Sequence, residues 1–279
     1  MNVMKIFLLM LASILFSMIT VSYAGEWSKI RIGTEGAYPP WNGTNAAGEL
    51  EGAEIDLAAD LCARMNAECE LVAQDWDGII PALQNGKYDA IMAGMSITDE
   101  RKVRIDFSIG YMTEPASLSA LSNTALGTLN APGKLNLDDM DAEAKGLLST
   151  LQSALAGASV GVQTATIHEN FLNEYMPDVT IKVYDTQQNM ELDLAAGRID
   201  AALCDKAAME TFADTPAGSG VTLIGPDLFG GSFGAGVGAG IRKSDSDLTA
   251  MFNKAIADAT ADGTVSRISM EWFGKDLSM

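Results

Sequence analysis

Histidine and cysteine are scarce in this chain of 279 residues. His168 is the single histidine, and Cys62, Cys69 and Cys204 are the only cysteines. A metal site built from several histidines is therefore impossible, and a histidine-based catalytic triad would have to use His168. We expect neither a metal nor a cofactor, and we predict that His168 lies on a helix surface without a chemical role.

Basic residues are also few. Eighteen Lys and Arg stand against 37 Asp and Glu, which gives a formal net charge of −19. Because phosphate binding requires clustered basic side chains, this balance argues against a nucleic-acid partner. It suits a small cationic ligand.

Long apolar runs are confined to the start of the chain. Lys5 is followed by an uncharged apolar run over residues 6–19, and residues 21–24 (VSYA) place small residues before a cut. The run is shorter than the roughly 20 residues of a spanning helix, so the pattern predicts a secretory signal peptide cleaved after Ala24. No cysteine stands at the cut to receive a lipid anchor, so we expect a freely diffusing periplasmic protein.

Strand and helix patterns alternate along the rest of the chain, which predicts an α/β fold with largely parallel sheets. Residues 29–33 and 89–93 read as strands, and residues 55–65 carry apolar residues at helical spacing. The alternation restarts at residues 158–162, so we expect two lobes with a cleft beyond the carboxyl ends of their strands. Further strands are expected at 70–73, 179–183 and 199–203, and helices at 78–83, from 98, and at 166–175, 189–196, 248–259 and 265–272.

Two stretches interrupt the alternation. Residues 123–157 are rich in Ala, Leu, Asp and Gly and predict an inserted surface loop with a helix over 138–155. Residues 229–240 (FGGSFGAGVGAG) are rich in glycine and precede the last helices, which suggests a crossing back into the first lobe.

Four stretches resemble the extracellular solute-binding proteins of polar amino-acid ABC transporters, family 3. Among these, the chain is most similar in pattern to the lysine/arginine/ornithine, histidine and opine binders. The longest stretch is WDGIIPALQNGKYDAIMAGMSITDERKVRIDFS at residues 76–108. The others are IRIGTEGAYPPWN (30–42), GELEGAEIDLAADLCARMNAEC (48–69) and GRIDAALCD (197–205), and GTVSRISMEWFG (263–274) matches the usual terminal helix.

The resemblance implies a type II periplasmic binding protein, with two α/β lobes joined by two hinge crossings. Each lobe would be a mostly parallel sheet flanked by helices. Lobe one would hold residues 25–110 and 235–279, and lobe two residues 111–234. A small ligand would bind between the lobes, and the closed form would dock on an ABC transporter permease in the inner membrane. We expect a monomer.

The same resemblance assigns the ends of the ligand. Arg101 would clamp the ligand α-carboxylate, because a guanidinium can hold a carboxylate in a bidentate fork. Ser96 precedes the helix of Arg101, where free backbone N–H groups favour an anion. Thr166, close to Gln163, would approach the same carboxylate from lobe two, and it also fits a plain N-cap. Asp205 would accept the α-ammonium group.

The ligand side chain would lie between Tyr38 and Trp76, whose faces suit an aliphatic stem and a cation. Glu35 matches the position at the far end, where a carboxylate favours a cationic tip. The first prediction is therefore a cationic amino acid of the arginine, ornithine or lysine type. Ala93 and Gly94 replace two serines that are common in the family. Space at Gly94 would suit an N-substituted amino acid, so an opine such as octopine or nopaline stays open as the alternative.

Cys62 and Cys69 match the disulfide of the lysine/arginine/ornithine and histidine binders, and export favours oxidation. Cys204 is then left without a partner and is expected to be buried in its strand. The competing function is a periplasmic cyclohexadienyl-type dehydratase on the same fold, for which Glu35 or Asp205 would supply a carboxylate. The motifs favour a binding protein over an enzyme.

Overall fold

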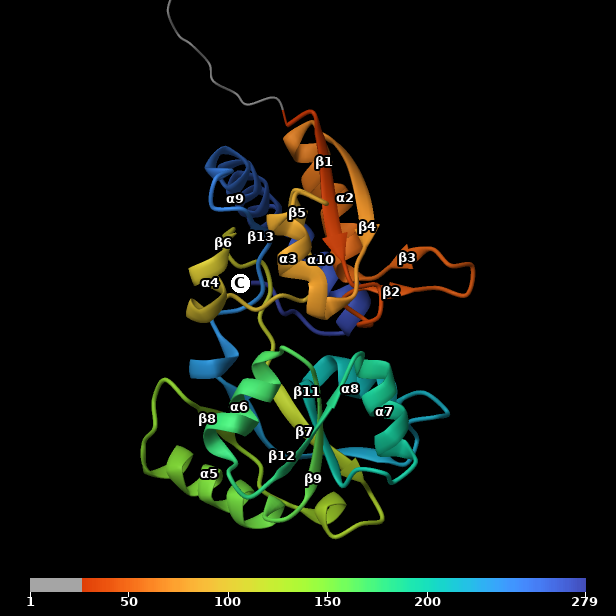
Figure 1. The fold of residues 1–279 in the computed structure, drawn as a ribbon, viewed down its shortest axis with the longest axis vertical. Helices are drawn as coiled ribbons and strands as arrows, with labels where there is room; N and C mark the ends of the chain where they lie inside the picture. Colours follow the sequence, from red (N-terminus) through yellow and green to blue (C-terminus); the bar gives the residue numbers. More distant parts are fainter. Residues whose placement is uncertain (1–26) are drawn as a thin grey trace, which may run out of the picture.

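The computed structural model describes residues 27–279, which form two α/β lobes stacked along the long axis of the molecule (Figure 1). The segment predicted as a signal peptide lies outside the described residues. Within residues 27–279, none of the helices has the length and apolar character needed to cross a bilayer.

The first lobe is built on a five-stranded sheet in the order β4-β1-β5-β13-β6. Strand β1 (Lys29–Thr34) is parallel to β4 (Glu68–Ala73) and β5 (Ala90–Ile91). Strand β13 (Gly240–Ile241) is antiparallel to β5 and to β6 (Asp106–Phe107). The parallel strands β1 and β5 therefore end at the same edge of the sheet, which faces the second lobe (Figure 1).

Successive side chains of β5 and of the residue that follows it enter two separate apolar cores, one on each face of the sheet. Ala90 and Met92 pack on the side of α2, α9 and α10, whereas Ile91 packs on the side of α3. A strand buried on both faces in this way is expected when helices cover both sides of a sheet. The helices are α2 (Ala53–Met65), α3 (Ile79–Gln84), α9 (Ser246–Ala261) and α10 (Thr264–Phe273), and a small hairpin of β2 (Gly43–Thr44) and β3 (Leu50–Glu51) projects beside them.

The second lobe holds a six-stranded sheet in the order β10-β9-β11-β7-β12-β8. Strand β9 (Ser159–Gln163) is parallel to β10 (Thr180–Tyr184) and β11 (Ala201–Asp205), whereas β7 (Ala116–Leu121) is antiparallel to β11 and to β12 (Val221–Phe229). One face of this sheet is covered by α5 (Ala142–Leu155) and α6 (Ile167–Tyr175), and the other by α7 (Gln187–Ala195) and α8 (Lys206–Ala213).

The stretch predicted as an inserted loop and helix contributes to the sheet. Strand β8 (Lys134–Asn136) pairs in parallel with the end of β12, and α5 (Ala142–Leu155) follows it. Leu135, Leu151 and Leu155 are fully buried in the core of the second lobe. The insertion is therefore an edge of the lobe rather than a surface appendage.

The chain passes between the lobes twice, from β6 to β7 and from β12 back to β13. Between β12 and β13 the glycine-rich segment forms a short 3₁₀ turn (Gly231–Phe233). Gly234 follows with φ 79°, and a Cβ there would lie 2.5 Å from the Ile97 carbonyl oxygen, so only glycine fits. The two crossings run side by side, since the Tyr111 N–H donates to the Val237 carbonyl at 2.9 Å.

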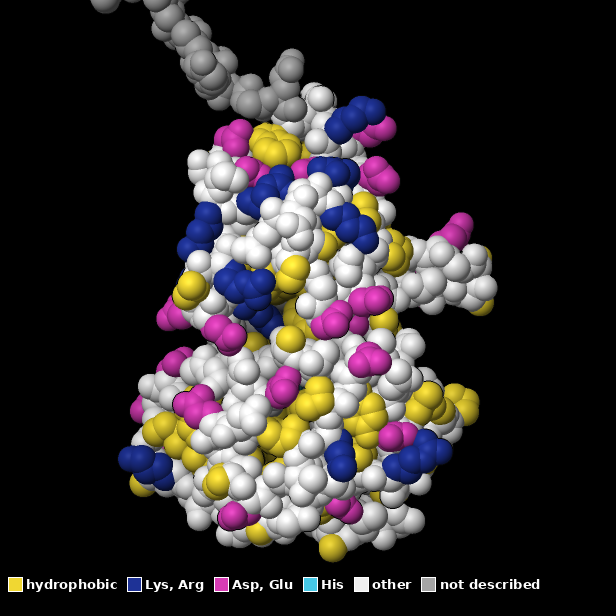
Figure 2. All heavy atoms as spheres, in the orientation of Figure 1, with side chains coloured by type: hydrophobic (Ala, Val, Ile, Leu, Met, Phe, Trp, Pro, Cys, Tyr) yellow, Lys and Arg dark blue, Asp and Glu magenta, His cyan; other side chains and the backbone are white. Residues whose placement is uncertain are grey.

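These crossings reverse the chain direction, which makes the strand pairs of β7 and β13 antiparallel and both sheets mixed. The predicted two-lobed α/β architecture is confirmed. The space-filling view shows the two lobes in contact on the face that is turned to the viewer, with acidic side chains on both sides of their junction (Figure 2).

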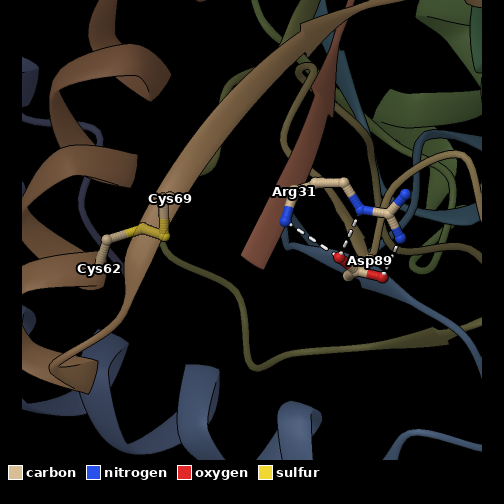
Figure 3. The surroundings of a disulfide bond; sticks show 4 residues. All are labelled: Arg31, Cys62, Cys69 and Asp89. Atoms are coloured by element: carbon tan, nitrogen blue, oxygen red, sulfur yellow. Dashed lines mark hydrogen bonds and ion pairs between the residues drawn. A yellow bond between two sulfur atoms is a disulfide. The ribbon is translucent and has the colours of Figure 1, made fainter. Parts of the chain in front are cut away.

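Cys62 at the end of α2 and Cys69 in β4 form the disulfide that the resemblance implied (Figure 3). It ties the last turn of the helix to the edge strand of the first sheet. Arg31 of β1 is drawn beside it, with its Nε 3.1 Å and its Nη2 2.9 Å from the carboxylate oxygens of Asp89 (Figure 3). Cys204 is unpaired and buried in β11.

The double variant Cys62→Ser/Cys69→Ser should have a free energy of unfolding lower by about 2–3 kcal/mol, because a short closed loop no longer restricts the unfolded chain. Urea denaturation of the ligand-free protein measures the loss. Reduction of the unmodified protein should reproduce it, and an unchanged unfolding midpoint in both experiments would contradict the prediction.

Candidate functional site

A cleft of about 410 Å³ lies between the lobes, at the carboxyl ends of the parallel strands. The structure brings all ten residues predicted for the ligand site to its walls: Glu35, Tyr38, Trp76, Ala93, Gly94, Ser96, Arg101, Gln163, Thr166 and Asp205. The cleft is also lined by five residues that were not predicted from the sequence: Ile167, His168, Gln187, Leu203 and Cys204.

Arg101 is a buried cation that forms no ion pair within residues 27–279. The residue is 9% exposed, and its Nη1 donates to the Ser96 carbonyl at 3.0 Å. Its Nη2 donates to the Ala165 carbonyl of the other lobe at 3.5 Å, and its guanidinium carbon lies 5.1 Å from the centre of the Trp76 ring. Burial lowers the pKa of Arg101 to about 10. Because a buried charge requires a counter-charge, the cleft is prepared for an anion.

The helix and the loop around Arg101 fix the position of its backbone, and therefore the point from which its side chain extends. Helix α4 (Asp99–Arg104) starts after Thr98, whose hydroxyl accepts the Arg101 N–H at 3.2 Å as an N-cap. The preceding loop is tied to the second crossing, where Ser96 forms a β-bridge with Val237. The anion-facing loop and the hinge therefore form one continuous structure.

Glu35 faces the opposite lobe. Its Oε1 accepts a hydrogen bond of 2.6 Å from Gln163 Nε2, which also donates to the Asp185 carbonyl. Burial raises the pKa of Glu35 to about 7, although the hydrogen bond from Gln163 by itself lowers this pKa. A cation placed here would restore the charged carboxylate.

Asp205 lines the same cleft at the end of β11 and is 7% exposed. Its Oδ1 is 3.3 Å from His168 Nε2, in a geometry that is not a hydrogen bond. Tyr38, from the first lobe, also lines the cleft, and burial together with the nearby Asp205 carboxylate raises the pKa of its hydroxyl. A carboxylate and a guanidinium thus occupy one cleft without neutralising each other by direct contact.

The placement of His168 on a helix surface is wrong, because the residue is 5% exposed and lines the cleft. It lies in the first turn of α6, and Phe171 and Leu172, three and four residues on, are fully buried. Residues at these spacings share one helix face. That spacing was the available signal that His168 points inward.

Thr166 is the N-cap of α6, since its hydroxyl accepts the Glu169 N–H at 3.3 Å and donates to the Gln163 carbonyl at 2.7 Å. Its hydroxyl is therefore occupied within the lobe. The preceding residue, Ala165, has φ 55°, a value that residues other than glycine seldom adopt. This turn directs the Ala165 carbonyl towards Arg101 and towards Trp76 Nε1, which donates to it at 3.4 Å.

A buried acid that the sequence reading missed connects the loops of the first lobe. Glu54, in the first turn of α2, is fully buried and accepts hydrogen bonds from Asn42 Nδ2 (2.9 Å), the Gly94 N–H (2.7 Å) and the Tyr111 hydroxyl. Asn42 Oδ1 in turn accepts the Gly36 N–H at 2.8 Å. Glu54 therefore holds the loops after β1 and β5 and the first crossing in one arrangement, and its burial raises its pKa to about 7.

Gly94 lines the cleft, but the space expected beside it is filled. The residue has φ 62°, and a Cβ would lie 3.1 Å from two atoms of the Tyr38 ring. The glycine is required by the backbone conformation and by the Tyr38 ring. The presence of glycine at this position is therefore explained without an N-substituted ligand.

Two lobes meet over a cleft whose walls hold two carboxylates and a cation that forms no ion pair within residues 27–279, and this arrangement is a site for a small charged molecule. Comparison with known proteins identifies the group. The chain belongs to the bacterial extracellular solute-binding proteins, family 3, whose sequence model matches residues 30–275.

Relatives in this family cover nearly the full length. The chain is 35% identical over 278 residues to the octopine-binding periplasmic protein of Rhizobium meliloti, covering 91% of this chain and 93% of that protein. It is 37% identical over 266 residues to the histidine-binding periplasmic protein of Salmonella typhimurium, covering 94% of each.

Solved structures agree on the fold. An ancestral arginine-binding protein bound to arginine superposes with a TM-score of 0.75 at 30% identity, over 88% of this chain and 99% of that one. A periplasmic His/Glu/Gln/Arg/opine family-binding protein from Silicibacter pomeroyi, in complex with lysine, gives a TM-score of 0.73 at 35% identity, over 90% and 99%.

Gly94→Ala should lower the free energy of unfolding by about 2 kcal/mol, because the left-handed backbone and the crowded Tyr38 ring both oppose a Cβ. Gly86→Ala is the matched control: Gly86 has φ 75°, but nothing lies within 4 Å of its Cβ position, so about 1 kcal/mol is expected. Urea denaturation compares the two variants. Equal losses would show that the space at Gly94 is open after all.

Proposed function

We propose that this protein is the periplasmic substrate-binding component of an ABC importer, and that it binds a cationic amino acid of the arginine, ornithine or lysine type. The observation that carries the proposal is the buried, unpaired Arg101 in a cleft that also contains Glu35 and Asp205. One cation and two carboxylates complement a ligand with one carboxylate and two cationic groups.

The positions of these charges give the ligand one orientation. Its α-carboxylate would lie on Arg101 in a bidentate fork, and its α-ammonium would lie on Asp205. The side chain would run along Tyr38 and Trp76 towards Glu35, where a cationic tip would meet the buried carboxylate. The relatives named for histidine and octopine, and the solved structures containing arginine and lysine, support a charged amino acid at this site.

The ligand would act by stabilising the closed arrangement of the lobes. Several hydrogen bonds cross between the lobes, from Gln163 to Glu35, from Trp76 to Ala165 and from Asn170 Nδ2 to Glu100. A ligand that bridges Arg101 and the second lobe adds differential binding energy to closure, which shifts the population. The closed form would dock on a permease in the inner membrane, in keeping with the periplasmic relatives and the predicted signal peptide.

A dehydratase is the second candidate, because Glu35 has a pKa raised to about 7, as a general acid requires. We infer binding without turnover, since the charges of the cleft match a zwitterionic amino acid with a cationic side chain. Incubation of the purified protein with arogenate or prephenate tests this inference. Product formation that Glu35→Gln abolishes would establish the enzyme instead.

Arg101→Ala should weaken arginine, lysine and ornithine alike by at least a hundredfold, since all three share the α-carboxylate. Calorimetric titration of the ligand-stripped protein measures the affinities. Arg104→Ala is the control, because Arg104 is exposed on the same helix and should leave them unchanged. A variant lacking Arg101 that still binds these ligands would remove the basis of the proposal.

The preference for arginine over neutral citrulline should shrink as the pH falls. Citrulline leaves Glu35 buried without a cation, so this carboxyl, with a pKa of about 7, takes up a proton on closure. Protonation then favours the citrulline complex below pH 7, by roughly tenfold at pH 6 relative to pH 8. Arginine keeps Glu35 ionised, so its affinity does not increase as the pH falls.

Calorimetry at pH 6, 7 and 8 with both ligands gives the ratio of affinities. Glu35→Gln should make this ratio independent of pH and close to one. A constant ratio in the unmodified protein would show that Glu35 does not meet the ligand side chain.

A further inference from the structure

Two rings flank Asp205, one from each lobe. His168 Nε2 is 3.3 Å from Asp205 Oδ1, and within the described residues this nitrogen has no hydrogen-bond partner. The Tyr38 ring of the first lobe lines the same cleft, and the Asp205 carboxylate contributes to the raised pKa of its hydroxyl. A group that binds Asp205 therefore lies close to His168 and shares the cleft with Tyr38.

The imidazole of His168 is held in place by an aromatic wall. Its ring lies 6.1 Å from that of Phe233, which in turn packs at 5.0 Å against Phe171. All three side chains are buried, and Phe171 is fully so. Because a packed wall of this kind resists repacking, His168 does not swing aside to admit a larger ligand.

We propose that His168 determines specificity at the amine end of the cleft and restricts the ligand to amino acids with a free primary α-amino group. This proposal rests on the proposed function and names its ligand class more narrowly. A primary ammonium has three N–H donors: Asp205 accepts from it, and neutral His168 Nε2 accepts as well. The unpaired buried nitrogen gains a partner when the ligand enters.

An N-carboxyalkyl amino acid fits this end poorly because its substituent must enter the space next to Asp205, where His168 Nε2 lies 3.3 Å away. The second carboxylate would also lie beside Asp205, where like charges in a buried cleft repel each other.

The first test titrates arginine and octopine into three proteins by calorimetry. The unmodified protein should bind arginine at least a hundredfold more tightly than octopine. His168→Ala should reduce this ratio at least tenfold, with octopine gaining affinity, whereas His168→Gln, which keeps bulk and a hydrogen-bond acceptor, should retain it. Equal or tighter octopine binding by the unmodified protein, or a ratio unchanged in His168→Ala, would overturn the proposal.

The second test needs no variant, because His168 is the only histidine. Its ring resonances in NMR spectra should shift on arginine binding. Unchanged ring resonances in the saturated complex would refute the contact. If arginine, lysine and ornithine all fail to bind, the proposed function itself fails, whereas arginine binding without a His168 response refutes only this inference.

Discussion

The buried guanidinium of Arg101, which forms no ion pair within residues 27–279, is the constraint on which the cleft between the lobes depends. Arg101 is held between the lobes by two backbone carbonyls and by the face of Trp76. Such contacts offset only part of the cost of removing a charge from water, which amounts to several kcal/mol. An anion between the lobes would offset that cost, so the proposed function couples closure to ligand binding.

The rest of the first lobe keeps this charge in position. The loop that precedes Arg101 is bridged to the second crossing through Val237, and Glu54 joins the neighbouring loops to the first crossing through Tyr111. These hydrogen bonds are buried, where an unmade bond is costly. The ligand-facing loops therefore move with the crossings, and hinge motion changes the distance between two rigid walls.

The two carboxylates that line the cleft, Glu35 and Asp205, differ in the groups that surround them. Glu35 has an amide neighbour and takes a proton near neutral pH, which suits a site that waits for a cationic tip. Asp205 is flanked by Tyr38 and His168, which limits the shape of its partner as well as its charge. In the proposed function, charge selects the side chain of the ligand, and in the further proposal His168 selects the form of its amine.

The sequence by itself determined the order of strands and helices, and with it the two-lobed fold and the strand ends where the cleft lies. The motif around Arg101 could be read directly, because its residues are neighbours in the chain. The links made by Glu54, the turn at Ala165 and the crowding of Gly94 by the Tyr38 ring were decided only by tertiary structure. Each depends on contacts between segments far apart in sequence, such as the Tyr38 ring over Gly94, and local patterns carry no information about such contacts.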